Sequence, residues 1–368
     1  MHLLFTIPDF WPHVRRGAER LVHDVGVEMI KRGHRVTVVT RTPAGPASRA
    51  TIDGLDVIYR RSRDALARRA GLDPMEGFGF QAALVPLVRR ADVYASHYPT
   101  DAAGLYAGGR ITRRPVAVNI LGWPDRAWME SRFHRSIGWI TRALRNAPVT
   151  VLSDGAARQM RDEFGIDARV LHPGTFTAQW ELPRQKQDRR TIVCSAAVDD
   201  PRKRIGVLVR AFCQVAASEP DLELLLVGPG DGAAHVADAR AIDASIAERI
   251  TLRPQTRPDE LPQILSRCTV GALTSVREAF GLVVVEYLAS GMPAVGCDDA
   301  GATEIITPET GALFPTDDVE GCADAIRRAL KLAGDPGSVE RCRERARRFD
   351  WSRAGDAHEA FYKEVAGS

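Results

Sequence analysis

Short apolar runs alternate with helix-length segments along the whole chain, and this alternation limits the folds that the chain can adopt. Residues 3–7 form the first run, residues 18–31 carry apolar side chains at the spacing of one helical face, and residues 35–40 form the next run. A strand, a helix and a second strand in this order make a unit of parallel type. The sequence therefore predicts parallel sheets covered by helices.

The same pattern restarts in the second half, with a strand at residues 191–196, a helix at 205–216 and a strand at 222–227. Further strands are predicted at residues 57–59, 93–96, 116–120, 149–152, 250–252, 268–273 and 294–296. A chain of 368 residues is too long for one ordinary core. We therefore predict an α/β fold of two doubly wound Rossmann-like domains, residues 1–178 and 191–350, which face each other across a cleft.

Two segments lie outside these predicted domains. Residues 179–190 are polar, contain Pro183 and lack periodicity, so we predict a linker there. Residues 351–368 have a helical pattern, and we expect this C-terminal helix to pack back on the N-terminal domain.

Several features of the chain predict a cytoplasmic protein. No apolar run approaches the eighteen or so residues of a spanning helix, and the first eight residues lack a basic region and a small-residue cleavage site. The six cysteines all lie in the second half without Cys-x-x-Cys spacing, which indicates reduced, buried thiols.

Charge is distributed unevenly between the two halves. Residues 1–180 contain 26 Lys and Arg against 17 Asp and Glu, whereas the rest of the chain contains 24 against 30. A basic first half suggests an anionic partner, which could be an acceptor molecule or a peripherally contacted anionic membrane. Compositional bias is the alternative, because 45 of the 50 basic residues are arginine. No aromatic interleaving or fold signature indicates nucleic-acid binding.

Two glutamates flank a predicted strand-to-helix turn in the second half. Residues 268–273 predict a buried strand and residues 283–289 the next helix, so Glu278 and residues 280–282 fall in the turn. The first amides of a helix suit a diphosphate, and Gly281 lets a ligand approach the backbone. Glu286 lies one turn further in among apolar neighbours, where ribose hydroxyls could supply its hydrogen bonds.

The residues around these glutamates form a denser pattern than two isolated acids. Glu278-Ala-Phe-Gly-Leu, then Glu286, then residues 290–293 and 301–304, resemble the donor site of the retaining glycosyltransferases of family 4. The resemblance implies the GT-B fold and a nucleoside diphosphate sugar, such as a UDP or GDP sugar, as co-substrate. It also implies retention at the anomeric carbon, with Glu278 on the sugar hydroxyls and backbone contacts from Gly281 and Leu282. Phe280 is a further donor-binding candidate in the same motif.

A basic loop follows the first predicted strand of the second half. Residues 199–204 read Asp-Asp-Pro-Arg-Lys-Arg, and Lys203 matches the family's phosphate-neutralising lysine. A cation there would stabilise the charge that grows on the leaving phosphate. The family commonly has an arginine six residues earlier, where this chain has Ala197, and Arg202, Arg204 or Arg277 could replace it.

Candidate residues in the first half are fewer. Arg16 and Gly17 resemble the family's Gly-Gly turn, with arginine in place of the first glycine, so Gly17 would allow close approach of the donor and Arg16 could contact an acidic acceptor. His97 follows a predicted strand, and we expect it to face the cleft as a catalytic group with Tyr98 on the acceptor side. Asn119 could bond sugar hydroxyls. The family often has a histidine where this chain has Leu121.

We predict no metal and no other cofactor, because the chain has no Asp-x-Asp triplet and side chains and helix amides could neutralise the diphosphate. The predicted function is metal-independent transfer of a sugar to an acceptor that is a small molecule, a glycan or a lipid. A sugar-nucleotide epimerase or hydrolase on the same fold, and a non-catalytic nucleotide-sugar-binding protein, remain as alternatives.

Overall fold

The computed structural model describes residues 1–42, 45–185, 187–254, 256–257, 259–299 and 301–367. The chain forms two compact units. The first consists of Met1–Gly174 with Trp351–Ser368, and the second of Thr175–Asp350. The predicted linker begins a few residues after this division, and its Lys186 lies outside the described residues.

The first unit contains one sheet in the order β3-β4-β2-β1-β5-β6-β7-β8, parallel except for the β3–β4 pair. Its strands are β1 (His2–Thr6), β2 (Arg35–Arg41), β3 (Ser48–Ile52), β4 (Leu55–Arg60), β5 (Val93–Ser96), β6 (Val116–Asn119), β7 (Val149–Val151) and β8 (Arg169–Val170). Its helices are α1 (Gly17–Lys31), α2 (Asp64–Arg69), α3 (Pro74–Ala83), α4 (Val85–Val88), α5 (Pro99–Thr112), α6 (Arg126–Arg132), α7 (Ile137–Asn146), α8 (Asp154–Phe164) and α17 (Trp351–Gly367).

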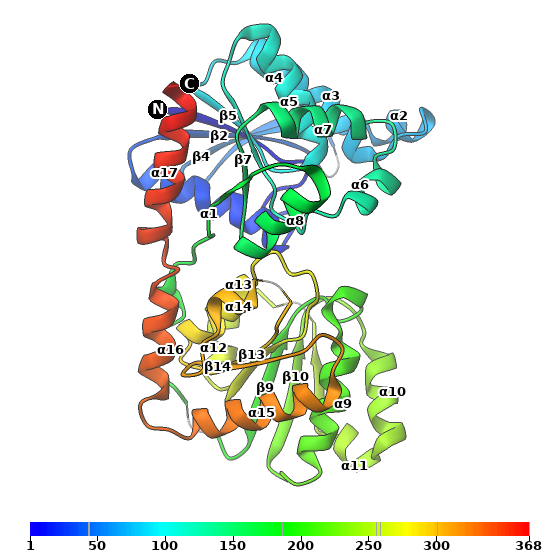
Figure 1. Ribbon diagram of the computed structural model, residues 1–368, viewed down its shortest axis with the longest axis vertical. Coiled ribbons are helices and arrows are strands. Elements are labelled where there is room, and N and C mark those ends of the chain that lie inside the picture. Colours follow the sequence, from blue (N-terminus) through cyan, green and yellow to red (C-terminus); the bar gives the residue numbers. More distant parts are fainter. Residues whose placement is uncertain (43–44, 186, 255, 258, 300, 368) are drawn as a thin grey trace. The chain divides into compact units, whose positions relative to one another are not determined.

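Side-chain alternation along β1 explains how helices cover both faces of this sheet. Leu4 packs in a buried cluster with Val85 of α4 and Leu105 of α5. Phe5 points to the other face, where its ring lies 5.7 Å from the Tyr362 ring of α17. Figure 1 shows α1 and α17 together on one side of the sheet and α4 and α5 on the other.

The second unit is built around a parallel sheet in the order β11-β10-β9-β12-β13-β14. Its strands are β9 (Arg190–Ser195), β10 (Leu222–Val227), β11 (Ile250–Arg253), β12 (Val270–Leu273), β13 (Ala294–Cys297) and β14 (Gly311–Phe314). Its helices are η1 (Thr177–Gln179), η2 (Pro201–Lys203), α9 (Ile205–Ala216), α10 (Ala233–Ile242), α11 (Ala244–Ala247), α12 (Leu261–Leu265), α13 (Leu282–Ala289), α14 (Ala302–Ile305), α15 (Val319–Ala333) and α16 (Ser338–Arg347).

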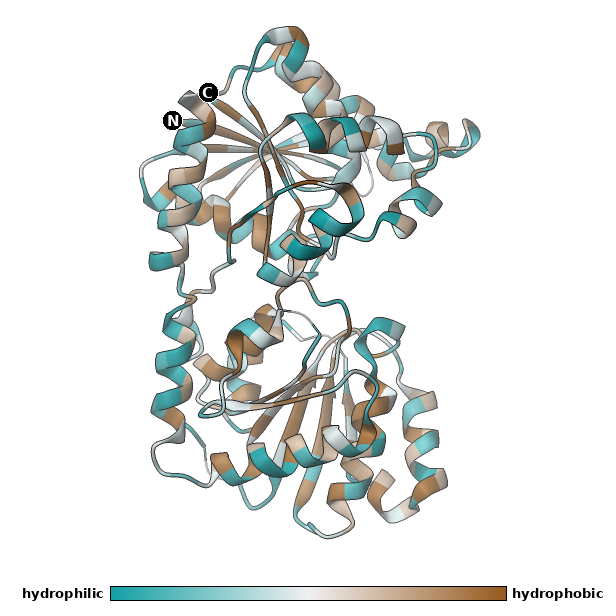
Figure 2. Ribbon diagram, in the orientation of Figure 1, coloured by the Kyte–Doolittle hydropathy of each residue, from teal (hydrophilic) through white to brown (hydrophobic). Residues whose placement is uncertain are grey.

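The core of the second unit lies between this sheet and its helices. Phe212 and Leu208 of α9 and Ile326 of α15 are completely buried against strand residues such as Leu224 and Val270. Figure 2 shows hydrophobic residues along the strands and on the inner sides of these helices. Two parallel, helix-covered sheets confirm the predicted α/β fold of two doubly wound Rossmann-like domains.

Three strands were not predicted from the sequence. Residues Ser48–Ile52 of β3 are largely exposed at the sheet edge, where a strand needs no apolar alternation. The two-residue β8 and the edge strand β14 are short. These three strands extend the edges of the sheets and leave the predicted central order intact.

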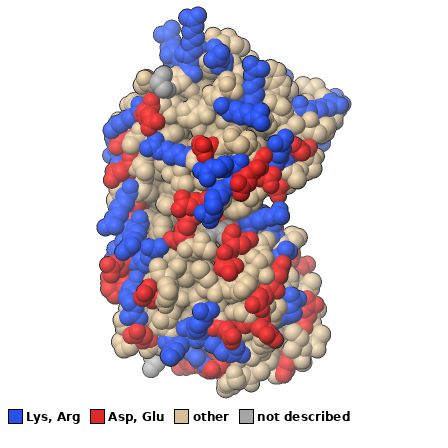
Figure 3. Space-filling view, in the orientation of Figure 1, with Lys and Arg blue, Asp and Glu red and all other residues tan. Residues whose placement is uncertain are grey.

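Basic side chains without acidic neighbours gather at one end of the first unit (Figure 3). Figure 3 shows blue side chains without red ones at the upper end of this unit, over α4 and the end of α5. Among the helices that the structure describes, none is both long enough and apolar enough to cross a bilayer. All six cysteines are free and buried.

Candidate active site

The turn between β12 and α13 has a backbone that requires glycine at its end. Gly281 caps α13 with φ of 95° and ψ of 53°, in the left-handed region where a Cβ is unfavourable. The amides of Leu282 and Val283 follow it directly at the helix start, where amides have no carbonyl partner within the helix, and the Val284 amide donates to the Gly281 carbonyl at 2.8 Å. The turn therefore presents helix amides at the carboxyl end of a buried strand, as the sequence predicted.

The basic loop after β9 is tied to this turn by two hydrogen bonds. The Thr274 hydroxyl donates to the Lys203 carbonyl at 2.7 Å, and the Val276 amide donates to the Arg202 carbonyl at 2.9 Å. The Asp200 carboxylate caps the loop by accepting the Arg202 amide at 2.9 Å. Two segments that are far apart in sequence thus share one local framework.

This framework brings the two main candidate residues into contact. The Lys203 ammonium lies 2.8 Å from the Glu278 carboxylate, and both side chains are partly buried. Lysine donates three hydrogen bonds and a carboxylate accepts several, so each group keeps capacity for a ligand. The predicted phosphate-binding cation and the predicted sugar-binding acid therefore lie side by side.

The three arginines that could replace the missing family arginine differ in their surroundings. Arg202 pairs with Asp200 at 2.6 Å, and Arg204 pairs with Asp317 at 2.9 Å. Arg277 is exposed, and its amide donates to Asp299 at 3.1 Å. Only Arg277 projects from the same turn as Glu278. Its contact with a donor stays a prediction.

The remaining donor-site candidates lie along α13 and the turn before it. Glu286 is buried within α13, Leu282 is partly buried at its first position, and Phe280 is buried with its ring 5.5 Å from that of Phe349. Burial makes Phe280 a packing residue of the turn. A ribose contact for Glu286 stays a prediction.

Tyr287 and Thr274 belong to no local sequence motif, although both position the candidate site. The buried Tyr287 hydroxyl accepts the Ser195 amide at 2.7 Å and so joins α13 to the end of β9. Gly271 makes room for this ring, because a Cβ there would lie 2.2 Å from it. Such cross-chain bonds leave no local signal in the sequence.

In the first unit, Arg16 at the start of α1 is held by ion pairs, whereas Gly17 next to it has open space around it. Arg16 is the N-cap of α1, and its guanidinium pairs with Asp9 at 2.9 Å and with Glu19 at 2.5 Å. A Cβ added to Gly17 would meet nothing within 4 Å. Protein packing therefore does not require glycine at position 17. Its predicted role in letting the donor approach remains a prediction.

His97, directly after β5, lies in a buried chain of polar groups with residues of β1, β6 and β7. Its ring nitrogens lie 3.3 Å from the Thr6 carbonyl and 3.4 Å from the Asn119 amide nitrogen. The Asn119 oxygen accepts the Thr150 hydroxyl at 2.7 Å. Burial lowers the pKa of His97 to about 3, so the imidazole is neutral at physiological pH. This arrangement favours a positioning role over the predicted acid–base role.

Tyr98 is partly buried, and Asp101, three residues later, is completely buried. The Tyr98 ring packs edge-on against Phe133 with 6.0 Å between centroids, and burial raises its pKa to about 12. Asp101 is completely buried, accepts the Thr6 hydroxyl, and has a pKa raised to about 8 by burial. Asp101 was not a sequence candidate, because one acid in a helical first turn is common.

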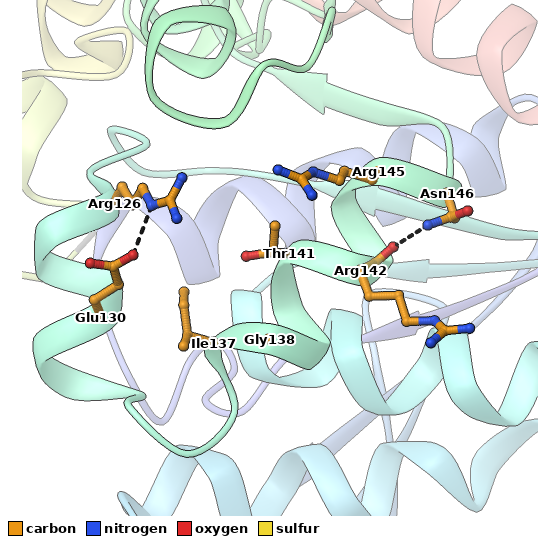
Figure 4. A pocket seen from close by; sticks show the side chains of 8 residues that line it. All are labelled: Arg126, Glu130, Ile137, Gly138, Thr141, Arg142, Arg145 and Asn146. Carbon is orange, nitrogen blue, oxygen red and sulfur yellow. Dashed lines mark hydrogen bonds and ion pairs between the residues drawn. The ribbon is translucent and has the colours of Figure 1, made fainter.

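A hollow of about 490 Å³ lies between α6 and α7 in the same unit. Figure 4 shows Arg126 and Arg145 above it with Thr141 between them, and Arg126 pairs with Glu130 at 2.7 Å. It contains none of the predicted site residues. Groups of three or more His, Cys, Asp or Glu that could hold a metal ion are absent from the residues that the structure describes.

Comparison with known families agrees with this geometry. The family described as glycosyl transferases group 1 matches residues 189–332, and glycosyltransferase family 4 matches residues 15–179. The two matches together cover most of both units. The chain belongs to the group 1 and family 4 glycosyltransferases, and its fold is of the GT-B type.

Individual relatives share about 30% sequence identity with parts of this chain. Over 224 residues the chain is 29% identical to the phosphatidyl-myo-inositol mannosyltransferase of Mycolicibacterium smegmatis, covering 59% of this chain and 57% of that protein. It is 32% identical over 199 residues to the D-inositol 3-phosphate glycosyltransferase of Mycobacteroides abscessus, covering 52% and 43%. The chain thus spans about half the length of these relatives.

Among solved structures, the Anabaena protein HepE in complex with UDP-glucose matches with a TM-score of 0.73 at 16% identity. The match covers 99% of this chain and 100% of that one. An identity this low establishes the shared fold only.

Proposed function

We propose that this protein transfers a sugar from a nucleoside diphosphate sugar to a hydroxyl acceptor, with retention at the anomeric carbon and without a metal ion. The contact between Lys203 and Glu278 beside the first turn of α13 carries the proposal. It pairs a cation for the leaving diphosphate with an acid for the sugar hydroxyls, at a helix start that suits phosphate.

The diphosphate would lie at the first amides of α13, next to Lys203. Negative charge on the leaving phosphate increases as the glycosidic bond breaks. A cation held beside it by Glu278 and by the Thr274 bond therefore stabilises the transition state more than the bound donor. Preorganisation matters here, because Lys203 needs no rearrangement to reach the phosphate.

Glu278 and Glu286 would hold the two ends of the donor. Glu278 would accept hydrogen bonds from the transferred sugar, and Glu286 from the ribose, while the Gly281 and Leu282 backbone contacts the phosphates. The acceptor would attack the face from which the nucleotide leaves, and a phosphate oxygen would take its proton. This route needs no nucleophile from the protein, which agrees with the buried, neutral His97.

The acceptor is proposed from the relatives. Both named relatives act, by their names, on an inositol phosphate or a phosphatidylinositol. We therefore propose a hydroxyl of a phosphorylated polyol, free or lipid-linked, as the first acceptor class to test. UDP sugars are the first donors to test, because the structural neighbour was solved with UDP-glucose. GDP sugars, which the family resemblance also implies, are tested beside them.

Thermal shift with UDP, GDP, ADP and TDP sugars would identify the donor, because a ligand that binds the folded protein raises its Tm. Product analysis with inositol phosphate and phosphatidylinositol would then measure transfer, and NMR would report the anomeric configuration. Transfer should persist in EDTA and be lost in Glu278→Ala, while Lys331→Ala on α15 should retain it.

Two results would contradict the proposal. Release or epimerisation of the sugar without an acceptor would instead support a hydrolase or epimerase. Donor binding without turnover over a broad acceptor panel would support a non-catalytic binding protein.

A further inference from the structure

Four large apolar side chains form an exposed stripe along α3 and α4. Phe80, Leu84, Leu87 and Val88 are 64%, 48%, 49% and 66% exposed. Leu84 has helical dihedral angles and joins the two helices, so the spacing of these residues places them on one side. An apolar stripe in water has an unfavourable free energy unless a partner covers it.

The opposite side of the same helices is already packed. Phe78, Ala82 and Val85 are buried there. A Cβ on Gly104 of α5 would lie 1.9 Å from the Gly79 carbonyl, so α5 and α3 are in close backbone contact. The core of the unit is therefore formed by the other side of these helices, and the exposed stripe takes no part in it.

Arginines surround the stripe. Arg89 and Arg90 follow α4 directly, and Arg110, Arg113 and Arg114 surround Ile111, which is 73% exposed at the end of α5. A Cβ on Gly108 of α5 would lie 2.2 Å from the Ala83 carbonyl and 3.1 Å from Pro86, so the end of α5 that precedes Arg110 packs closely against α4, which precedes Arg89. Residues 77–91 and 102–124 contain no Asp or Glu.

A cavity of about 970 Å³ extends the basic surface from Val88 to the start of the sheet. Arg89, Arg90 and Arg35 line it with His2. Its one acid, Asp56, is paired with Arg49 through two bonds of 2.5 and 2.8 Å. The cavity therefore has an excess of positive charge at the amino ends of β1 and β2.

We propose that this surface, which we call the arginine-rimmed surface, docks on an anionic lipid bilayer. It consists of Phe80, Leu84, Leu87, Val88 and Ile111 with Arg35, Arg89, Arg90, Arg110, Arg113 and Arg114. The apolar side chains enter the interface between headgroups and acyl chains, and the guanidinium groups bind lipid phosphates. A second copy of this chain is a poorer partner, because arginines would face arginines.

The docking surface and the candidate groups lie at opposite ends of the first sheet. Arg89 and Arg90 precede β5, and Arg113 and Arg114 precede β6, whereas His97 follows β5. A bilayer on this surface would therefore leave the carboxyl ends of these strands uncovered. The proposal does not depend on the proposed transferase activity.

Vesicle flotation with the full chain tests it. Vesicles of phosphatidylcholine with one third phosphatidylglycerol should bind the protein, and vesicles of phosphatidylcholine alone should not. Arg89→Glu with Arg90→Glu should lower the partition coefficient at least about tenfold, since each arginine near an anionic surface contributes about 1 kcal/mol. Leu87→Ser with Val88→Ser should also weaken binding. The matched control, Arg68→Glu with Arg69→Glu on α2, should bind as the unmodified chain does.

Unchanged Tm values would show that these surface variants remain folded. Equal binding to both vesicle types, or an equal loss in the α2 control, would overturn the proposal. Sedimentation that shows a dimer abolished by the Leu87 and Val88 changes would also overturn it in favour of a second copy. Donor binding and transfer to a water-soluble acceptor should be the same in all variants, which separates this proposal from the function.

Discussion

The Lys203 ammonium and the Glu278 carboxylate, 75 positions apart in sequence, lie 2.8 Å from each other in the second unit. Lys203 is 19% exposed and Glu278 26%. An ion pair this accessible contributes at most about 1 kcal/mol to stability. The ion pair lies beside the helix start that we assign to the diphosphate. Ligand binding therefore explains this pair better than stability does.

Lys203→Ala should therefore affect catalysis far more than folding. Loss of one charge-stabilising group should lower kcat by about 10²–10³-fold, while the Tm changes by only a few degrees. Steady-state kinetics with the identified donor, beside calorimetric donor affinity, would measure this. If donor affinity falls and kcat does not, Lys203 acts in ground-state binding. Lys331→Ala serves as the control for loss of a lysine.

Helices and strands with a regular spacing of buried apolar side chains could be predicted from the sequence. Helix α9 and strand β10 have the bounds that periodicity predicted, because apolar spacing reflects burial directly. Strand β3 was missed, since its pairing with β4 depends on backbone bonds at an exposed edge.

Prediction of the site from the sequence was limited by long-range contacts. The donor-side residues were found because they form a dense local motif. The bond from Thr274 to Lys203 was not, because it joins residues 71 positions apart. The burial of His97 under Phe5 and Asn119 depends on the packing of three strands, which no local pattern reports.

Gly301→Ala should shift the backbone of the turn that carries Glu278 without changing either residue of the Lys203–Glu278 ion pair. A Cβ at this position would lie 2.2 Å from the Phe280 Cα, and the Gly301 amide donates to the Glu278 carbonyl at 3.2 Å. Because backbone must move, we expect a stability loss of about 1–3 kcal/mol and a fall in kcat. Chemical denaturation and kinetics would measure both. Gly334→Ala, with its nearest atom at 3.4 Å, should change neither.

Gly17→Ala tests whether a ligand approaches the start of α1. The protein leaves open space at this position, so the Tm should be unchanged or slightly higher, as expected for alanine in a helix. If the donor contacts Gly17, the new methyl group should raise its Kd about tenfold or more, which titration calorimetry would detect. An unchanged donor Kd and unchanged kcat would remove Gly17 from the donor site.

Asp101 should make the stability of the first unit depend on pH. Burial raises its pKa from the model-compound value of 3.8 to about 8, so the folded protein holds a proton that the unfolded chain releases at lower pH. Stability from this group is complete below about pH 4 and is lost as the pH rises toward 8. Asp101→Asn removes the titration and keeps an oxygen to accept the Thr6 hydroxyl. Between pH 5 and 8, unfolding free energies of the unmodified protein should fall relative to Asp101→Asn by up to about 1 kcal/mol per pH unit. Parallel profiles for the two proteins would show that the Asp101 carboxylate is charged in the folded state.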